Sequence, residues 1–130
     1  MPIEPGIRGT ASCVVSDKHT AKSLRSGGLD VLATPIMIAL MEEAALTSVR
    51  PYLDPGADTV GTRLDVSHLS ATPVGMKAWA ESELVEIDRR RLVFSVKAYD
   101  EAGLIGEGTH ERFIIDSEKF TAKCRSKLSK

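Results

Sequence analysis

The chain has 130 residues, 42% of them hydrophobic and 27% charged, with 17 basic and 18 acidic side chains and a net charge of −1. This length suits a single domain over 1–130 that folds without disulfides or metal. The charge balance excludes the strongly basic surface of a typical nucleic-acid-binding protein, and no apolar run is long enough to span a bilayer. Because Cys13 and Cys124 are far apart and no apolar leader precedes them, we expect a cytoplasmic protein with free thiols.

Residues 1–33 predict one strand and little other regular structure. The segment 1–6 contains two prolines and a glycine and is expected to be a loose lead-in. Residues 7–16 end in an apolar run that is typical of a short strand. Residues 17–31 predict only a helical turn, because the glycine pair at 27–28 interrupts any longer helix.

The clearest helix is predicted over residues 34–50. Thr34 suits the N-cap, and Pro35 suits the first helical position, where a missing N–H costs nothing. Apart from Glu42 and Glu43 the first three turns are apolar nearly all the way round, which is typical of a buried helix. We therefore expect the rest of the chain to wrap around this helix.

The remaining sequence predicts four strands, over 59–70, 76–87, 91–99 and 104–115. In the first of them the residues alternate, so that one face should carry Val60, Thr62, Leu64, Val66 and His68. Short turn sequences separate the strands, which favours antiparallel neighbours. One hydrophobic helix with such a sheet indicates an α+β domain. Residues 117–130 are polar, carry five Lys or Arg, and are expected to be a frayed, loose terminus or a terminal helix turn.

Two ionisable side chains fall on apolar faces. Glu42 lies on the helix stripe of Ala45 and Val49, where an unpaired charge is costly, and a structural ion pair is the simpler explanation for an isolated glutamate. His68 should point from its strand at the helix. A lone histidine there is more often a hydrogen-bonded core residue. A buried Glu and a buried His facing one another, however, form a candidate acid/base site.

Thr34 is the third candidate. It lies eight residues before Glu42, just over two helical turns away on an overlapping face. A threonine before a proline-led helix is ordinarily a cap. The same helix start also offers free N–H groups and the positive end of the dipole, which together with the Thr34 hydroxyl could stabilise an oxyanion.

The other polar residues give weaker signals. His110 and Arg112 share one face of the last strand and are expected to be solvated, although Arg112 could meet a phosphate or a carboxylate. Gly106 and Gly108 do not form a phosphate loop and favour close approach of another backbone. No metal site is expected, because the histidines and cysteines show no ligand spacing.

Six short stretches act together as a motif set. They are Thr34-Pro35, Glu42 at the end of Ile38–Glu42, Val60–Thr62, Val66–Leu69, Ala71–Gly75 and Ile105–Arg112. Together they resemble the hotdog-fold acyl-CoA thioesterases, and most closely the fluoroacetyl-CoA thioesterase branch, over roughly residues 7–115. The spacing of Thr34, Glu42 and His68 is far more specific than any one of these residues.

The resemblance implies a hotdog fold, in which a five-stranded antiparallel sheet wraps a long helix. It implies a homodimer, or a dimer of dimers, whose sheets join edge to edge with two active sites at the interface. It implies catalytic roles for Thr34, Glu42 and His68, an acyl pocket at Gly61, and a place near the site for Arg112. The implied reaction is hydrolysis of a small acyl-CoA thioester, with CoA as part of the substrate and no cofactor.

Several alternatives remain open on the sequence. Glu42 either attacks the thioester carbonyl or activates a water. A hydratase or dehydratase acting on an acyl thioester, or a non-catalytic acyl-CoA-binding protein, would share the same fold. Residues 17–33 contain no Phe, Tyr or Trp, whereas fluoroacetyl-specific members carry phenylalanines there, so we expect thioesterase chemistry without fluoroacetyl specificity.

Overall fold

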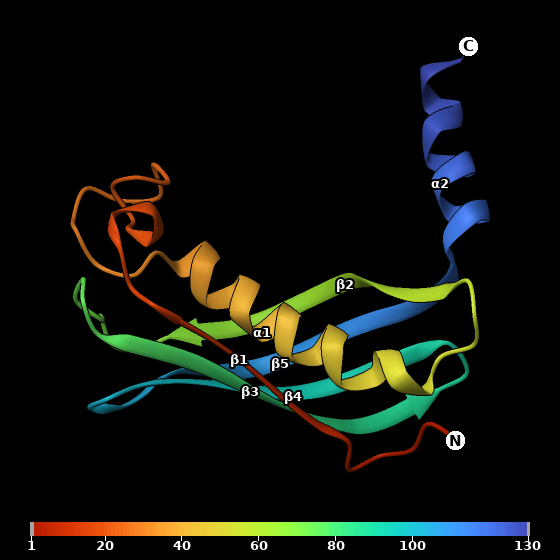
Figure 1. Ribbon diagram of the computed structural model, residues 1–130, viewed down its shortest axis with the longest axis horizontal. Coiled ribbons are helices and arrows are strands. Elements are labelled where there is room, and N and C mark those ends of the chain that lie inside the picture. The colour runs from red at the N-terminus through yellow and green to blue at the C-terminus, as the bar shows by residue number, and fades with distance from the viewer. Residues whose placement is uncertain (1, 130) are drawn as a thin grey trace.

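One curved antiparallel sheet wraps around one long helix (Figure 1). The computed structural model describes residues 2–129. Its strands are β1 (Arg8–Val14), β2 (Ala57–His68), β3 (Lys77–Asp88), β4 (Arg91–Asp100) and β5 (Gly103–Asp116). They lie in the order β1-β3-β4-β5-β2, and all neighbouring pairs are antiparallel. The predicted α+β class is therefore confirmed, and each strand begins and ends within two residues of its predicted bounds.

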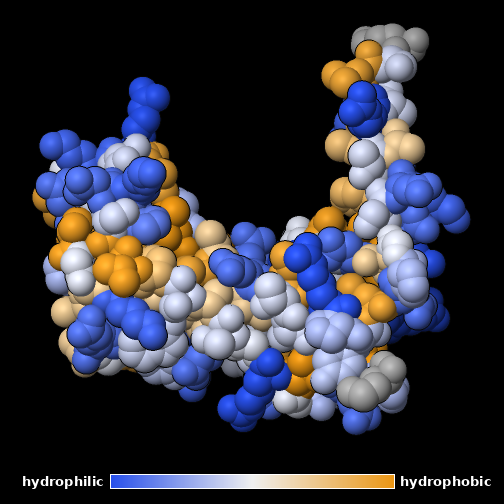
Figure 2. Space-filling view, viewed as in Figure 1, coloured by the Kyte–Doolittle hydropathy of each residue, from blue (hydrophilic) through white to orange (hydrophobic). Residues whose placement is uncertain are grey.

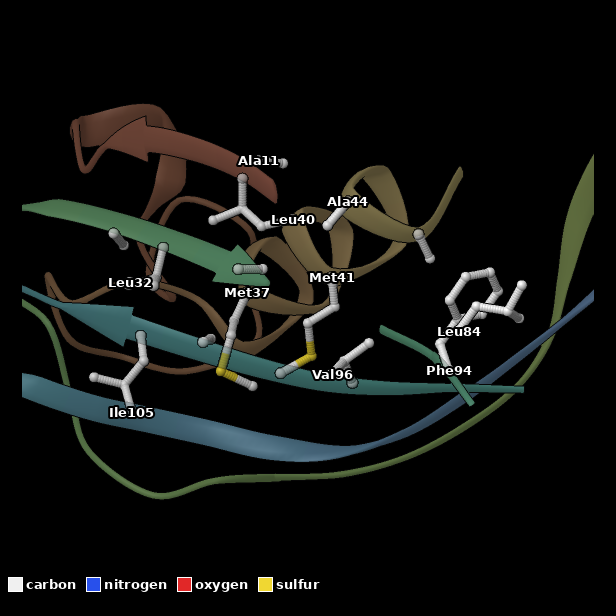
Figure 3. Packing of buried hydrophobic residues seen from close by; sticks show 14 of the residues in the cluster. Ala11, Leu32, Met37, Leu40, Met41, Ala44, Leu84, Phe94, Val96 and Ile105 are labelled. Carbon is white, nitrogen blue, oxygen red and sulfur yellow. The ribbon is translucent and has the colours of Figure 1, made fainter. Parts of the chain in front are cut away.

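Helix α1 (Thr34–Val49) lies in the hollow of the sheet. Its buried side chains are Met37, Leu40, Met41, Ala44, Ala45 and Val49. They pack against an inner sheet face that includes Leu84, Phe94 and Val96 (Figure 3). Burial of each large apolar side chain contributes about 1.5–3 kcal/mol. The α-helix ends before the short 3-10 turn η2 (Arg50–Tyr52), because Pro51 cannot continue its hydrogen bonding.

Residues 17–33 form a lobe beside the start of α1 (Figure 1). The lobe begins with the 3-10 turn η1 (Asp17–His19) and is otherwise built of turns, as predicted. Its backbone is fixed at both ends: Ala33 N–H donates to the His19 carbonyl (2.8 Å), and Leu32 N–H donates to the Thr72 carbonyl (2.9 Å). These bonds hold the chain where it enters α1.

A β-bulge at Thr62 corrects the predicted inner face of β2. The register with β5 passes from the pair Gly61↔Arg112 to the pair Arg63↔Glu111, which leaves Thr62 without an opposite residue. Strict alternation placed Val60 and Thr62 on the same face as His68, and this was wrong. Since paired residues share a face, the extra residue puts Gly61 on the inner face with Leu64 and His68.

The chain ends in an arm, made of α2 (Ser117–Arg125) and the 3-10 turn η3 (Ser126–Leu128). Asp116 caps α2 by accepting a hydrogen bond from Lys119 N–H (3.0 Å). The arm has no buried residue and projects beyond β2, so that a hollow lies between it and the lobe (Figure 2). Within residues 2–129, no helix is long and apolar enough to cross a membrane.

Candidate active site

The first residue of α1 meets the last residue of β2. Thr34 Oγ1 lies 2.7 Å from His68 Nδ1, so His68 points at the helix as its strand pattern predicted. The predicted N-cap role of Thr34 is wrong, because the cap is Ala33 and Thr34 already lies inside the helix. Its hydroxyl makes no cap hydrogen bond and turns to the histidine instead. A hydroxyl paired with an imidazole is an arrangement suited to acid–base or nucleophilic catalysis.

His68 lines a cavity beneath the lobe. The cavity has a volume of about 300 Å³ and is bounded by Thr34, His68 and small or aliphatic residues such as Ala21, Leu32 and Ala71. The Nε2 atom of His68 is buried and has no hydrogen-bond partner within residues 2–129. Burial lowers the pKa of His68, against a smaller opposing effect of the Ser70 backbone. The neutral ring is therefore favoured at neutral pH.

The start of α1 offers fewer free amides than predicted. Met37 N–H donates to the Ala33 carbonyl (3.1 Å) as the first helical bond, and Ile36 N–H donates to the same oxygen (3.0 Å). Pro35 has no N–H. In this described first turn, the donor left for a substrate oxygen is the Thr34 amide, since the Thr34 hydroxyl pairs with His68.

Glu42 pairs with Arg112 and does not face His68. Its Oε2 atom lies 3.7 Å from Arg112 Nη1, and its side chain is 40% exposed in the single chain. The predicted buried carboxylate opposite His68 is therefore wrong: within residues 2–129, His68 bonds to Thr34 and Glu42 pairs with Arg112. Gly61 lies against the same carboxylate, since a Cβ there would come within 2.7 Å of Glu42 Oε2.

Arg112 and His110 are buried, although the sequence predicted that both would be solvated. Their exposed fractions are 5% and 0%. Arg112 Nε donates to Thr59 Oγ1 (2.8 Å), Nη2 donates to the Thr59 carbonyl (2.9 Å), and Nη1 lies 3.1 Å from His110 Nε2. Burial lowers the pKa of Arg112, and the charges of Glu42 and Asp58 oppose this shift. Hydrogen bonds on both sides make a buried guanidinium tolerable here.

Sequence reasoning missed His110 and Thr59 as parts of the site. At alternate positions, β5 places Gly106, Gly108, His110 and Arg112 on the face turned to α1. The opposite face is also polar, so the pattern gave no apolar side by which to recognise the inner one. The two glycines were the available signal, because glycine in a strand marks close approach of another group. A Cβ at Gly106 would lie 2.6 Å from Met37 Sδ.

The pairs Thr34–His68 and Glu42–Arg112 lie along one side of α1. Eight residues separate Thr34 from Glu42, which corresponds to about 12 Å along the helix axis. Both pairs lie beside β2, one of the two edge strands of the sheet.

Other features lie apart from these two pairs. A groove of about 630 Å³ runs over β1 and β3, where Lys77 and Trp79 line it, and none of the predicted site residues does. Trp79 stacks on Tyr99 with 5.7 Å between ring centroids. Among residues 2–129, no group of three His, Cys, Asp or Glu side chains is placed to hold a metal ion.

Comparison with known proteins identifies relatives of this fold and site. The family model described as "Fluoroacetyl-CoA-specific thioesterase" matches residues 15–118. A fluoroacetyl-CoA thioesterase of Streptantibioticus cattleyicolor is 45% identical over 98 residues, which cover 75% of this chain and 70% of the relative.

Solved structures of other thioesterases superimpose closely on this chain. The fluoroacetyl-CoA thioesterase FlK superimposes with a TM-score of 0.92 at 38% identity, covering 98% of each chain. A thioesterase superfamily member from Thermus thermophilus superimposes with a TM-score of 0.87 at 29% identity, covering 95% of this chain and 92% of the other. The chain therefore belongs to the fluoroacetyl-CoA-specific thioesterase family and is an acyl-CoA thioester hydrolase with the hotdog fold.

Proposed function

We propose that this chain hydrolyses the thioester of a small acyl-CoA with Thr34, Glu42 and His68 as its catalytic residues. The observation that carries the assignment is the 2.7 Å hydrogen bond between Thr34 and His68 at the mouth of a cavity, on the same helix that carries the Glu42 carboxylate. CoA is part of the substrate, no further cofactor is needed, and the reaction belongs in the cytoplasm.

Thr34, His68 and Glu42 each have a separate role in the proposed reaction. The thioester carbonyl lies at the start of α1, where the Thr34 N–H supports the developing oxyanion. We assign His68 Nδ1 as the acceptor of the Thr34 hydroxyl hydrogen across their 2.7 Å contact, so Nε2 carries the ring proton. Nε2–H donates a hydrogen bond to the sulfur of the leaving thiolate, which departs as an anion and takes its proton from solvent water. Glu42 supplies the attack, either directly through a mixed anhydride or by taking a proton from the attacking water. Because about 12 Å of helix separates Thr34 from Glu42 in one chain, the carboxylate that acts on this carbonyl is the one that the second copy of a homodimer brings across the β2 edge.

Gly61 and Arg112 form the binding side of the site. Because Gly61 has no side chain, its backbone lies directly against Glu42 Oε2, His110 and Arg112 Nη1, where a Cβ would lie only 2.7–3.4 Å from each of these groups. The acyl group is assigned to the exposed side of Gly61, next to the carboxylate. Arg112 supplies a fixed positive charge next to it.

A single assay series tests the proposal. Thiol release is followed over a panel of acyl-CoAs from acetyl and fluoroacetyl to aryl and medium-chain, with Glu42→Gln beside the unaltered protein. Glu42→Gln should lower kcat by about 10²–10⁴, the usual contribution of a general base. Near-full hydrolysis by both Glu42→Gln and His68→Ala would overturn the assignment.

Two outcomes would point to other activities. Loss of an enoyl-CoA chromophore without thiol release would indicate a hydratase or dehydratase, and binding without turnover would indicate a non-catalytic acyl-CoA-binding protein. Label in the Glu42 carboxylate after a single turnover in ¹⁸O-labelled water would show direct attack, with water opening the mixed anhydride at the glutamyl carbonyl. Water activation never labels Glu42 and carries the label only into the released acid.

A further inference from the structure

We infer that His110 is a positioning residue for the hydrolysis, holding the guanidinium of Arg112 against the Glu42 carboxylate. The inference rests on the catalytic role proposed for Glu42. His110 itself lies behind Arg112 and bonds to it and to the backbone of β2.

Both ring nitrogens of His110 have defined partners. Nδ1 lies 2.9 Å from the Arg63 carbonyl, and because a carbonyl only accepts, Nδ1 must carry the proton. Nε2 is then an acceptor and receives the hydrogen bond of Arg112 Nη1 at 3.1 Å. Burial is the largest effect on the pKa of His110 and lowers it. The Arg112 charge also lowers this pKa, whereas the bond to the Arg63 carbonyl and the charges of Glu42 and Glu111 raise it. The ring is thus a neutral donor–acceptor bridge between β2 and Arg112.

His110 fixes the one guanidinium nitrogen that faces Glu42. Thr59 accepts from Nε and Nη2 of Arg112 and so holds one side of the planar group. The group could still tilt about that side. The bond from Nη1 to His110 stops the tilt, and Nη1 is the atom that lies 3.7 Å from Glu42 Oε2.

A purely structural role would need only the shape of the ring. His110 on β5 lies opposite Phe94 on β4, with 6.2 Å between ring centroids, and an aliphatic residue could fill this space. The structure instead places a fully buried imidazole there, with each nitrogen bonded to a group of the site or its strand. A fully connected polar chain of this kind orients its members as a unit.

A double-mutant cycle on kcat/KM tests the inference, using the best acyl-CoA of the panel. His110→Leu should lower kcat by about tenfold to 10²-fold, as expected for a misplaced catalytic group, with a smaller change in KM. Arg112→Gln should be slower still. The double variant should be no slower than Arg112→Gln alone, because His110 acts through Arg112.

Conservative variants keep the test decisive if His110→Leu does not fold. The amide oxygen of His110→Gln can accept from Arg112 Nη1 and should restore most of the rate. His110→Asn keeps a donor for Arg63 but is too short to reach Arg112, and should stay slow. Additive losses in the cycle, or equal rates for the Gln and Asn variants, would overturn the inference.

Two controls separate stability from positioning and from the role of Glu42. Phe94→Leu perturbs the same buried contact without touching Arg112, so it should lower the melting temperature while leaving kcat nearly unchanged; a loss of kcat equal to that of His110→Leu would count against positioning. Glu42→Gln is measured in parallel. Its full activity would refute the role of Glu42, whereas the coupling between His110 and Arg112 is decided by the cycle alone.

Discussion

Two histidines, the half-buried His68 and the buried His110, serve the site in their neutral forms. His68 bonds to Thr34, and His110 bonds to Arg112 and Arg63. For each of them, burial is the largest cause of a lowered pKa. Both imidazoles are thus kept uncharged near neutral pH, with one ring nitrogen as a hydrogen-bond donor and the other as an acceptor.

The stability of the fold should depend on this preference. In the unfolded chain both histidines bind protons below a pKa of about 6.5, whereas the folded chain resists protonation. The unfolded state therefore binds more protons, and the free energy of unfolding should fall as the pH drops through about 6.5 toward the lowered values. Urea unfolding at pH 8, 7, 6 and 5 measures this slope. His110→Gln should flatten it, and an unchanged slope would contradict the prediction.

The Thr34 hydroxyl can be tested against its methyl group. Thr34→Ala removes the partner of His68 Nδ1 and should lower kcat by about 10²-fold, within the range for a lost acid–base partner. Thr34→Ser keeps the hydroxyl and should lose much less. Steady-state thiol release gives both values. Equal losses for the two variants would show that the hydroxyl is not the functional part of Thr34.

At the scale of elements, β2 shows what the sequence could and could not predict. Alternation correctly placed Leu64 and His68 toward the helix, because the period of two holds on one side of the bulge. It failed for Val60 and Thr62, since a bulge depends on the pairing with β5 and leaves no local signature. Elsewhere, propensity and turn residues were enough to place every strand and α1.

The candidate site was predicted in part for the same reason. Thr34 and His68 were found because each is a polar residue at a position set by its own element. The burial of Arg112 and His110 depends on partners far away in sequence, Thr59 and the Arg63 carbonyl. Such compensation cannot be seen in a single strand, where a charged residue is usually exposed.

Two glycines on the β2–β5 pair should respond differently to alanine. The Cβ of Gly61→Ala would lie 2.7 Å from Glu42 Oε2, the end of a flexible side chain. We expect this variant to keep its melting temperature and to lose about tenfold in kcat/KM, because Glu42 is displaced. The Cβ of Gly108→Ala would overlap the Asp65 carbonyl and lie 2.6 Å from Val66 Cα.

For Gly108→Ala the strands themselves must move apart. The expected loss is about 1–3 kcal/mol in the free energy of unfolding, typical of overpacking. Thermal unfolding and thiol release on both variants check the contrast. A Gly61→Ala protein that is destabilised as much as Gly108→Ala would contradict it.

At the scale of the whole molecule, β2 pairs with β5 on one side and, within residues 2–129, with no strand on the other. It is a twelve-residue edge strand, and long unprotected edges are usually covered. Leu64 and Leu69 are 39% and 56% exposed beside the site. We infer that a second copy pairs with this edge of β2 and completes both active sites. This arrangement is the edge-to-edge homodimer that the sequence resemblance implies.

Light scattering should therefore give a mass of twice the 14.0 kDa chain, or four times for a dimer of dimers. Successive residues in a strand direct their N–H groups to opposite sides. Of Leu64→Pro and Asp65→Pro, one should break the β2–β5 ladder and the other should block only the free edge. The folded variant should be monomeric and nearly inactive. A monomeric variant with full kcat would show that the partner copy is not needed.

The projecting arm has a practical consequence for labelling. Cys124 is exposed on α2, whereas Cys13 is partly buried in β1, where burial and the nearby Glu43 raise the pKa of its thiol. A maleimide dye at neutral pH should therefore attach to Cys124 first, since the thiolate is the reactive form. In the inferred dimer, the distance between one fluorophore on each arm would report whether the two arms move apart when substrate binds.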